Sequence, residues 1–145
     1  MIQFSPLEAD IVLDCDVDPK TRFKIRSLRF CDEEKIQAEV AKVGDVPQSR
    51  LRQLTAKWQS EGESAPLDAD EEKDLNTLTS MRIANENWQC ALGVTEIDCK
   101  AVSPEDVLSM LGSIPAMSRD KVRSELARRV VELGKPAPKS ETPSE

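Results

Sequence analysis

By type and spacing, the residues best suited to chemistry are Asp14 and Asp16, which follow the apolar run 11–13 in a D-x-D arrangement. An aspartate at the end of a buried strand can attack a phosphoryl group, while a second carboxylate exchanges the proton and Mg²⁺ binds nearby. This motif is therefore typical of an enzyme that transfers a phosphoryl group.

Phosphatases of the haloacid-dehalogenase type begin with this pattern, but the residues that come next differ. In those enzymes the strand is central in a parallel sheet and leads to a helix, whereas here Asp18-Pro19-Lys20 forms a turn and a basic strand follows. A calcium-binding EF-hand loop fails too, because Pro19 occupies its glycine position and Ile25 its closing glutamate position. We therefore interpret the aspartates as the solvated face of a β-hairpin, and we predict no enzyme, metal or cofactor.

The histidine and cysteine content of the chain gives no indication of a catalytic site. The chain has no histidine, which excludes imidazole as a base, an acid or a metal ligand. None of its four cysteines falls in a C-x-x-C pair, so a zinc site is not expected. We predict reduced, packed thiols, and for Cys15 and Cys31 in particular no disulfide.

The elements that position these residues begin with two stretches that alternate with period two, residues 11–17 and 21–27. Antiparallel pairing keeps both apolar sets on one face only if the numbers of paired residues sum to an even value. The two charged sets then share the other face. This register predicts that Asp14 and Asp16 lie opposite basic side chains of the second stretch, namely Arg22, Lys24 or Arg26.

After the hairpin the apolar spacing changes to the helical period and predicts about five helices. The fold class is therefore α+β, mainly helical, with an N-terminal antiparallel β-hairpin. The clearest start signal is Ser103-Pro104-Glu105-Asp106, with a capping serine and proline at the first helical position. The expected bounds are a helix capped by Asp32 and ending before Gly44, one from Pro47 to near Gly62, one from about Asp70 to Leu92, one capped by Ser103 and stopped by Gly112 and Pro115, and one capped by Ser118 and ending at Gly134.

Composition limits the domain organisation and the partners. The 145 residues are 39% hydrophobic and 3% aromatic, which predicts one aliphatic-cored domain over residues 1–134 and a disordered tail over 135–145. The net charge of −7 opposes nucleic acid and anionic membranes, and we expect neither as a partner. A nucleic-acid-binding regulator is the alternative, using the basic residues Arg22, Lys24, Arg26, Arg50 and Arg52. No apolar run is long enough to span a bilayer and no signal peptide is evident, so we expect a cytoplasmic protein.

The candidate partner-binding residues are Trp58, Trp88, Leu108 and Leu111. The tryptophans lie on predicted helix faces, and tryptophan anchors dominate many interfaces. The helix after Ser103 has apolar residues on more than one side, so it is either buried deeply or docked to a partner. Internal packing is the alternative for each of the four.

The order of these elements resembles that of the small tail assembly chaperones of long-tailed bacteriophages. The likeness covers residues 8–133: an acidic N-terminal strand, the stretch 21–28 running into the helix at Asp32, and the Ser103 helix followed by the Ser118 helix. It implies a non-enzymatic protein, in the host cytoplasm if phage-encoded. Such a chaperone keeps the helical tape measure protein soluble until tail tube protein, a further partner, polymerises around it. A structural or adaptor subunit retained in the particle is the alternative.

Overall fold

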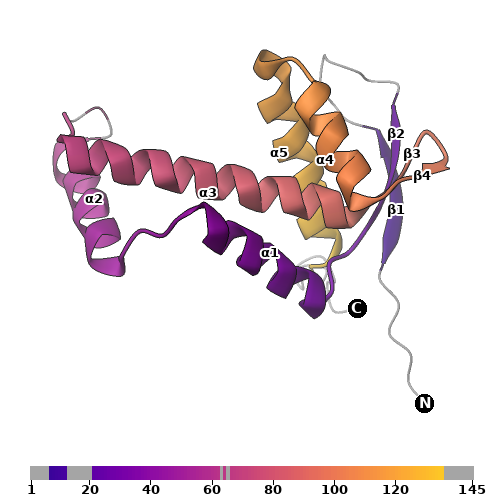
Figure 1. Cartoon of the computed structure of the whole chain (residues 1–145), viewed down its shortest axis with the longest axis horizontal. Helices are drawn as coiled ribbons and strands as arrows, with labels where there is room; N and C mark the ends of the chain where they lie inside the picture. Colours follow the sequence, from indigo (N-terminus) through magenta and orange to yellow (C-terminus); the bar gives the residue numbers. More distant parts are fainter. Residues whose placement is uncertain (1–6, 13–20, 63, 65, 136–145) are drawn as a thin grey trace, which may run out of the picture. The chain divides into compact units, whose positions relative to one another are not determined.

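The computed structural model describes residues 7–12, 21–62, 64 and 66–135. In this part of the chain the fold is mainly helical, with an N-terminal antiparallel strand pair, and the predicted α+β class is confirmed. Figure 1 shows four strands and five helices: β1 (Glu8–Val12), β2 (Arg22–Arg26), α1 (Phe30–Val43), α2 (Gln48–Glu61), α3 (Ala69–Gly93), β3 (Val94–Ile97), β4 (Lys100–Ala101), α4 (Pro104–Ser113) and α5 (Ala116–Leu133).

The β1–β2 register confirms the parity rule and corrects the predicted partners. Paired residue numbers all sum to an even value, and the apolar pair Ile11 and Phe23 lies on one face. The basic residues Arg26, Lys24 and Arg22, however, lie opposite Glu8, Asp10 and Val12, so the predicted pairing with Asp14 and Asp16 is wrong. Asp14 and Asp16 lie outside the described residues. Parity alone permits several registers, and the one adopted starts the first strand three residues earlier than expected.

The segment after α3 forms β3 and β4. All neighbouring strands are antiparallel in the order β1-β2-β3-β4. The β3–β4 turn is made by Asp98 and Cys99, with φ of 50° and 68°. The Asp98 carboxylate accepts a hydrogen bond from the Arg22 N–H at 2.9 Å, which fastens this turn to β2.

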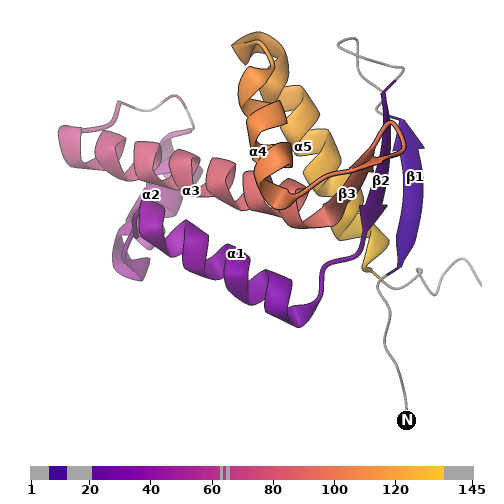
Figure 2. The ribbon, with the colours of Figure 1, turned by 45° about the vertical axis from the view of Figure 1, so that its right-hand side comes forward.

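The chain divides into two compact units, residues 1–34 with 86–145 and residues 35–85. In the first unit, Figures 1 and 2 show α4 and α5 on one side of the sheet. The core lies between them and contains Ile11, Phe23, Ile25, Cys90, Ala91, Val94, Val107, Leu111, Val122, Leu126, Ala127 and Val130. The core is aliphatic except for Phe23, as the composition predicts.

The second unit contains the C-terminal part of α1, all of α2 and the N-terminal part of α3. Its buried apolar side chains are Ile36, Val46 and Leu54. Gly44 permits a close approach, because a Cβ there would lie 2.9 Å from the Thr77 methyl group. Since α1 and α3 each supply residues to both units, the single domain expected for residues 1–134 stays a prediction.

Of the three predicted capping side chains, two are wrong and one is confirmed. Asp32 is not the cap of α1 but its third helical residue, and its carboxylate accepts the Arg29 N–H at 2.8 Å from inside the helix. Likewise Ser118 lies in the first turn of α5, whose N-cap is Pro115. Ser103 caps α4 as predicted, in a complete capping box with Asp106.

Cys31 is a free cysteine, as predicted, but the prediction that it is packed is wrong, because its side chain is exposed on α1. Cys90 is the buried free thiol and Cys99 is exposed in the β3–β4 turn. Cys15 lies outside the described residues. Cys31 follows Phe30, which is 76% exposed, at the start of α1, and it is the next residue, Asp32, that is buried in this turn.

Candidate protein-binding surface

Hydrogen bonds at both ends fix the position of α4. At its start the Ser103 hydroxyl accepts the Asp106 N–H at 3.2 Å, and the Asp106 carboxylate accepts the Ser103 N–H at 3.0 Å. At its end the Arg119 guanidinium donates to the Ile114 carbonyl at 2.9 Å and to the Gly112 carbonyl at 3.3 Å. Carbonyl groups that a helix end leaves unpaired are satisfied in this way, so α4 is held as a defined helix.

The apolar side chains of α4 fall into a buried stripe and two flanks. Val107 and Leu111, one turn apart, are 0% and 2% exposed and form the stripe. Leu108 lies on one flank, and Met110 with the capping residue Ile114 lies on the other; all three are half-buried and pack against the edge of the core. Three residues further, Met117 is 92% exposed at the start of α5.

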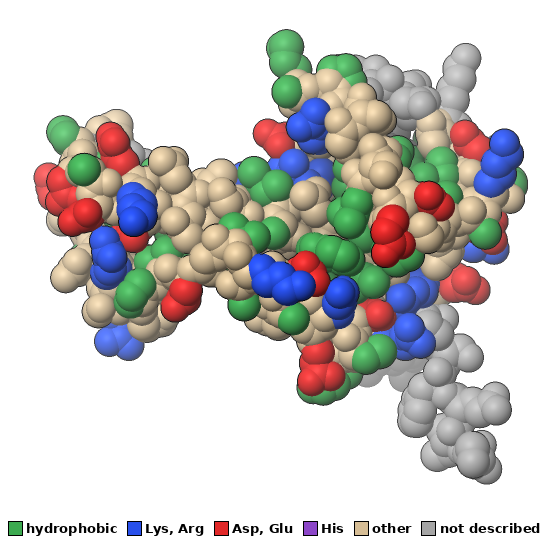
Figure 3. Space-filling model, in the orientation of Figure 1, with side chains coloured by type: hydrophobic (Ala, Val, Ile, Leu, Met, Phe, Trp, Pro, Cys, Tyr) green, Lys and Arg blue, Asp and Glu red, His purple; other side chains and the backbone are tan. Residues whose placement is uncertain are grey.

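We call Met110, Ile114 and Met117, which follow one flank of α4 to the start of α5, the α4 surface; Leu108 lies on the opposite flank of α4. Figure 3 shows hydrophobic side chains reaching the surface over this part of the first unit, beside charged groups. A helix that buries two apolar residues and leaves others half-exposed on both flanks retains apolar area that a partner helix could cover.

The four predicted binding residues differ in their burial and in the unit to which they belong. Leu108 and Trp88 are both half-buried and pack against the same core cluster of the first unit. Leu111 is a core residue and leaves no side-chain area for a partner in this conformation. Trp58 is half-buried on α2 and belongs to the second unit.

Met117 is the surface residue that the sequence reasoning missed. With Ser118 as the expected cap, Met117 would precede the helix, at the position where an apolar side chain packs back against the first turn. With Pro115 as the actual cap it is the second helical residue and faces solvent. The signal that could have found it is Pro115 itself, since a helix can begin directly after a proline.

A buried cation joins α5 to the C-terminal part of α3. Arg123 is 2% exposed, and its guanidinium donates to Glu86 at 2.9 Å and to Asp120 at 2.6 Å. The Ser124 hydroxyl donates to the same Glu86 oxygen at 3.1 Å. These bonds satisfy a charge that would be costly to bury alone, so Arg123 is a packing residue of the first unit.

The buried thiol of Cys90 is part of the same region. Burial raises the pKa of Cys90 to about 12, and the thiol donates to the Arg123 carbonyl at 3.4 Å. A thiol that stays protonated is a poor nucleophile and a poor metal ligand. Cys90 therefore acts as a small core residue.

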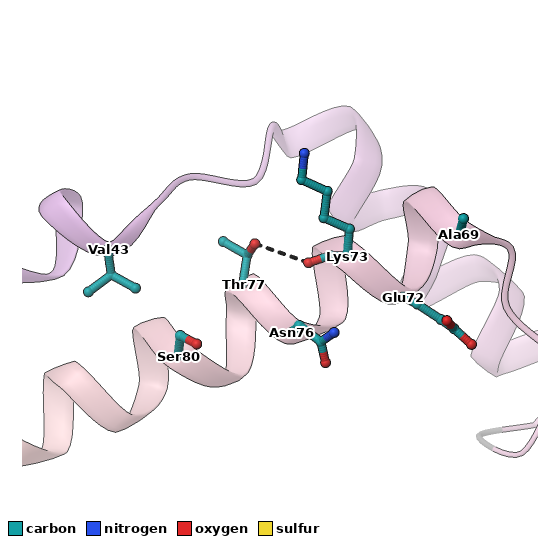
Figure 4. A pocket seen from close by; sticks show the side chains of 7 residues that line it. All are labelled: Val43, Ala69, Glu72, Lys73, Asn76, Thr77 and Ser80. Atoms are coloured by element: carbon teal, nitrogen blue, oxygen red, sulfur yellow. Dashed lines mark hydrogen bonds between the residues drawn. The ribbon is translucent and has the colours of Figure 1, made fainter.

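The second unit contains an open hollow of about 390 Å³ between the end of α1 and α3. Figure 4 shows Val43 of α1 facing Thr77 and Ser80 of α3. The Thr77 hydroxyl donates to the Lys73 carbonyl of its own helix at 3.0 Å. The Thr77 hydroxyl is thus bonded within its own helix, and Ala69, Glu72, Lys73 and Asn76 complete the lining of the hollow.

Comparison of the chain with protein-family models, curated proteins and solved structures gives no match. Within the described ranges, no group of three His, Cys, Asp or Glu side chains is placed to hold a metal ion. None of the described helices has the length and apolarity needed to cross a membrane.

Proposed function

We propose that this protein is a non-enzymatic binding protein that holds an amphipathic helical segment of another protein against its α4 surface. More specifically, we propose a phage tail assembly chaperone whose partner is the helical tape measure protein. The observation that carries the proposal is the exposure pattern of α4 and its turn: two apolar residues buried, three half-exposed and Met117 at 92% exposed. The family assignment is supported by the order of elements in the sequence.

The chemistry of the surface suits a helical partner. Apolar side chains spaced along one helix and its following turn offer the ridges into which another helix packs. The net charge of −7 keeps copies of the chain apart while leaving this apolar patch available. Many copies along one long partner give a strong combined attachment even if each contact is weak.

Co-expression with the tape measure protein encoded by the same genome tests this proposal. Wild-type chain should keep the tape measure protein in the soluble fraction, whereas the variant Met117→Asp should let it precipitate. Met117 is almost fully exposed, and an acidic residue in the first turn of α5 favours that helix, so this variant should stay folded. Burying one methionine is worth about 1.5–3 kcal/mol, enough to weaken each contact at least tenfold.

Ser109→Asp is the matched control, because Ser109 is exposed on the neighbouring helix α4 and the variant gains the same charge. Ser109→Asp should protect the tape measure protein as wild type does. A second variant, Leu108→Asp, tests the other flank, with circular dichroism to check that it remains folded. If wild type gives no protection, or Met117→Asp protects equally well, the proposal is wrong.

A further inference from the structure

Among the strands that the structure describes, β1 pairs on one side only, with β2. In the sheet order β1-β2-β3-β4, β1 and β4 are the edges, and β1 is the longer, with five residues against two. Figure 2 shows β1 as the outermost described strand. An edge of this kind presents backbone N–H and C=O groups to which another strand can pair.

The alternation of hydrogen bonds between β1 and β2 shows which residues of β1 have backbone N–H and C=O groups that point away from β2. The Ser27 N–H donates to the Leu7 carbonyl at 2.8 Å, just before β1 begins. In an antiparallel pair, hydrogen-bonded positions recur at every second residue. Ala9 and Ile11 therefore exchange hydrogen bonds with β2, and the N–H and C=O groups of the even residues of β1 point away from the sheet.

The hydrogen bonds of β2 with β3 follow the same alternation. On β2 the Arg22 carbonyl accepts from the Asp98 N–H at 2.8 Å, and the Lys24 carbonyl accepts from the Thr95 hydroxyl at 3.2 Å, so the even residues of β2 turn toward β3. Each strand thus uses alternate residues for its two neighbours. For β1, the residues that face away from β2 are Glu8, Asp10 and Val12, all exposed.

Charge alternates from strand to strand on this face. Glu8 and Asp10 of β1 lie opposite Arg26 and Lys24 of β2, and Lys24 forms an ion pair with Glu96 of β3 at 3.7 Å. Arg26 forms its ion pair with Asp32, at 2.7 Å. Lys24 and Arg26 of β2 thus form their ion pairs with residues outside β1. A strand added beside β1 would complement it best with basic side chains.

We propose that β1 binds an extended segment of a partner protein that carries Lys or Arg at alternate positions, adding a fifth strand to the sheet. Self-pairing of two copies is disfavoured, since antiparallel β1–β1 pairing centred on Ala9 or Asp10 would place carboxylates opposite each other. The binding site does not involve the α4 surface. It can therefore exist whether or not the chain is a tape measure chaperone.

The proposal is tested by adding a synthetic peptide, in which Lys alternates with Thr, to the full chain and recording nuclear magnetic resonance spectra of the chain. Its addition should shift the amide signals of Glu8, Asp10 and Val12 and slow their hydrogen exchange. A Lys directly opposite Glu8 or Asp10 would exchange backbone hydrogen bonds with it. A peptide N-methylated at its Lys residues should therefore lose binding, whereas one N-methylated at its Thr residues should retain it.

Charge variants complete the test. Asp10→Lys should weaken the Lys peptide about tenfold and favour a peptide with Glu in place of Lys. Glu34→Lys, the same charge change on an exposed residue of α1, should leave binding unchanged. The proposal is overturned if the Lys peptide does not bind, if the two N-methylated peptides bind equally, or if Glu34→Lys weakens binding as Asp10→Lys does. Slow exchange of the Glu8, Asp10 and Val12 amides without peptide would also overturn it.

Discussion

Cys99 adopts a backbone conformation that glycine favours. It follows Asp98 in a two-residue turn, and both residues have positive φ, at 68° and 50°. Two-residue hairpin turns with positive φ at both positions are commonly Asn-Gly or Asp-Gly, so Cys is the unfavourable member here. Asp98 tolerates its conformation better, because its carboxylate accepts the Arg22 N–H.

Replacing Cys99 by glycine should therefore stabilise the protein by about 0.5–1 kcal/mol. Urea unfolding followed by circular dichroism measures the change. Cys31→Gly is the control, since Cys31 is equally exposed but helical, and this variant should give no gain. Equal or lower stability for Cys99→Gly would show that the turn is not strained at this residue.

The carboxylate of Asp32 links the end of β2 to the start of α1. It accepts hydrogen bonds from the Arg26 guanidinium at 2.7 Å and the Arg29 N–H at 2.8 Å. Burial alone would raise the pKa of Asp32, but these hydrogen bonds and the nearby arginine charge outweigh it and lower the pKa. The ionised form is therefore the one that the folded protein favours.

Stability should consequently depend on Asp32 in acid. Aspartate in an unfolded chain has a pKa of about 3.9, and the folded value is lower, so the contribution is complete well above pH 4 and lost as pH falls through the folded pKa. Asp32→Asn should cost about 1.5–3 kcal/mol at pH 7 and reduce the loss of stability below about pH 4. Unfolding free energies across this range measure both effects. An unchanged acid slope in the variant would contradict the account.

At the scale of the elements, the ion pairs of Arg123 tie α5 to the end of α3. Arg123→Ala should destabilise the protein by about 3 kcal/mol or more, since Glu86 would lose its cation. The double variant Arg123→Met with Glu86→Leu should be less destabilised, because it removes both partly buried charges and the remaining partner, Asp120, is exposed to solvent. Denaturant unfolding compares the two, and a double variant as unstable as Arg123→Ala would show that the ion pair is not the cause.

Local signals predicted most of the elements. The Ser103 capping box fixed the start of α4, and Pro47 with Gly62 fixed α2, because these residues act within one turn of a helix end. The β1–β2 register could not be predicted from the sequence, since it depends on which apolar pairs face the core. Asp32 and Ser118 were misassigned as caps because the same side chains also occur inside the first turn of a helix.

The binding surface was less predictable than the fold. The excess of apolar residues on α4 is visible in the sequence, but which of them are buried depends on packing against the sheet and α5. Leu111 faces the core and Leu108 its edge, although both are leucines on one helix. Met117 became recognisable only once the start of α5 was known.

At the scale of the whole molecule, the two units offer a test of cooperativity. Cys90 is buried in one unit and Trp58 lies in the other. In a variant with Trp88→Phe and the other cysteines replaced by serine, thiol labelling and fluorescence report the two units separately. We expect coincident urea transitions, because α1 and α3 supply residues to both units. Separate midpoints would show two domains.

The proposed binding of an amphipathic helix of the tape measure protein to the α4 surface can be measured directly. The most direct measurement is titration calorimetry of the purified chain with helical segments of that protein. Wild type and Ser109→Asp should bind the same segment with equal affinity, and Met117→Asp should bind at least tenfold more weakly. Binding that is absent in wild type, or that Met117→Asp leaves unchanged, would contradict the proposal.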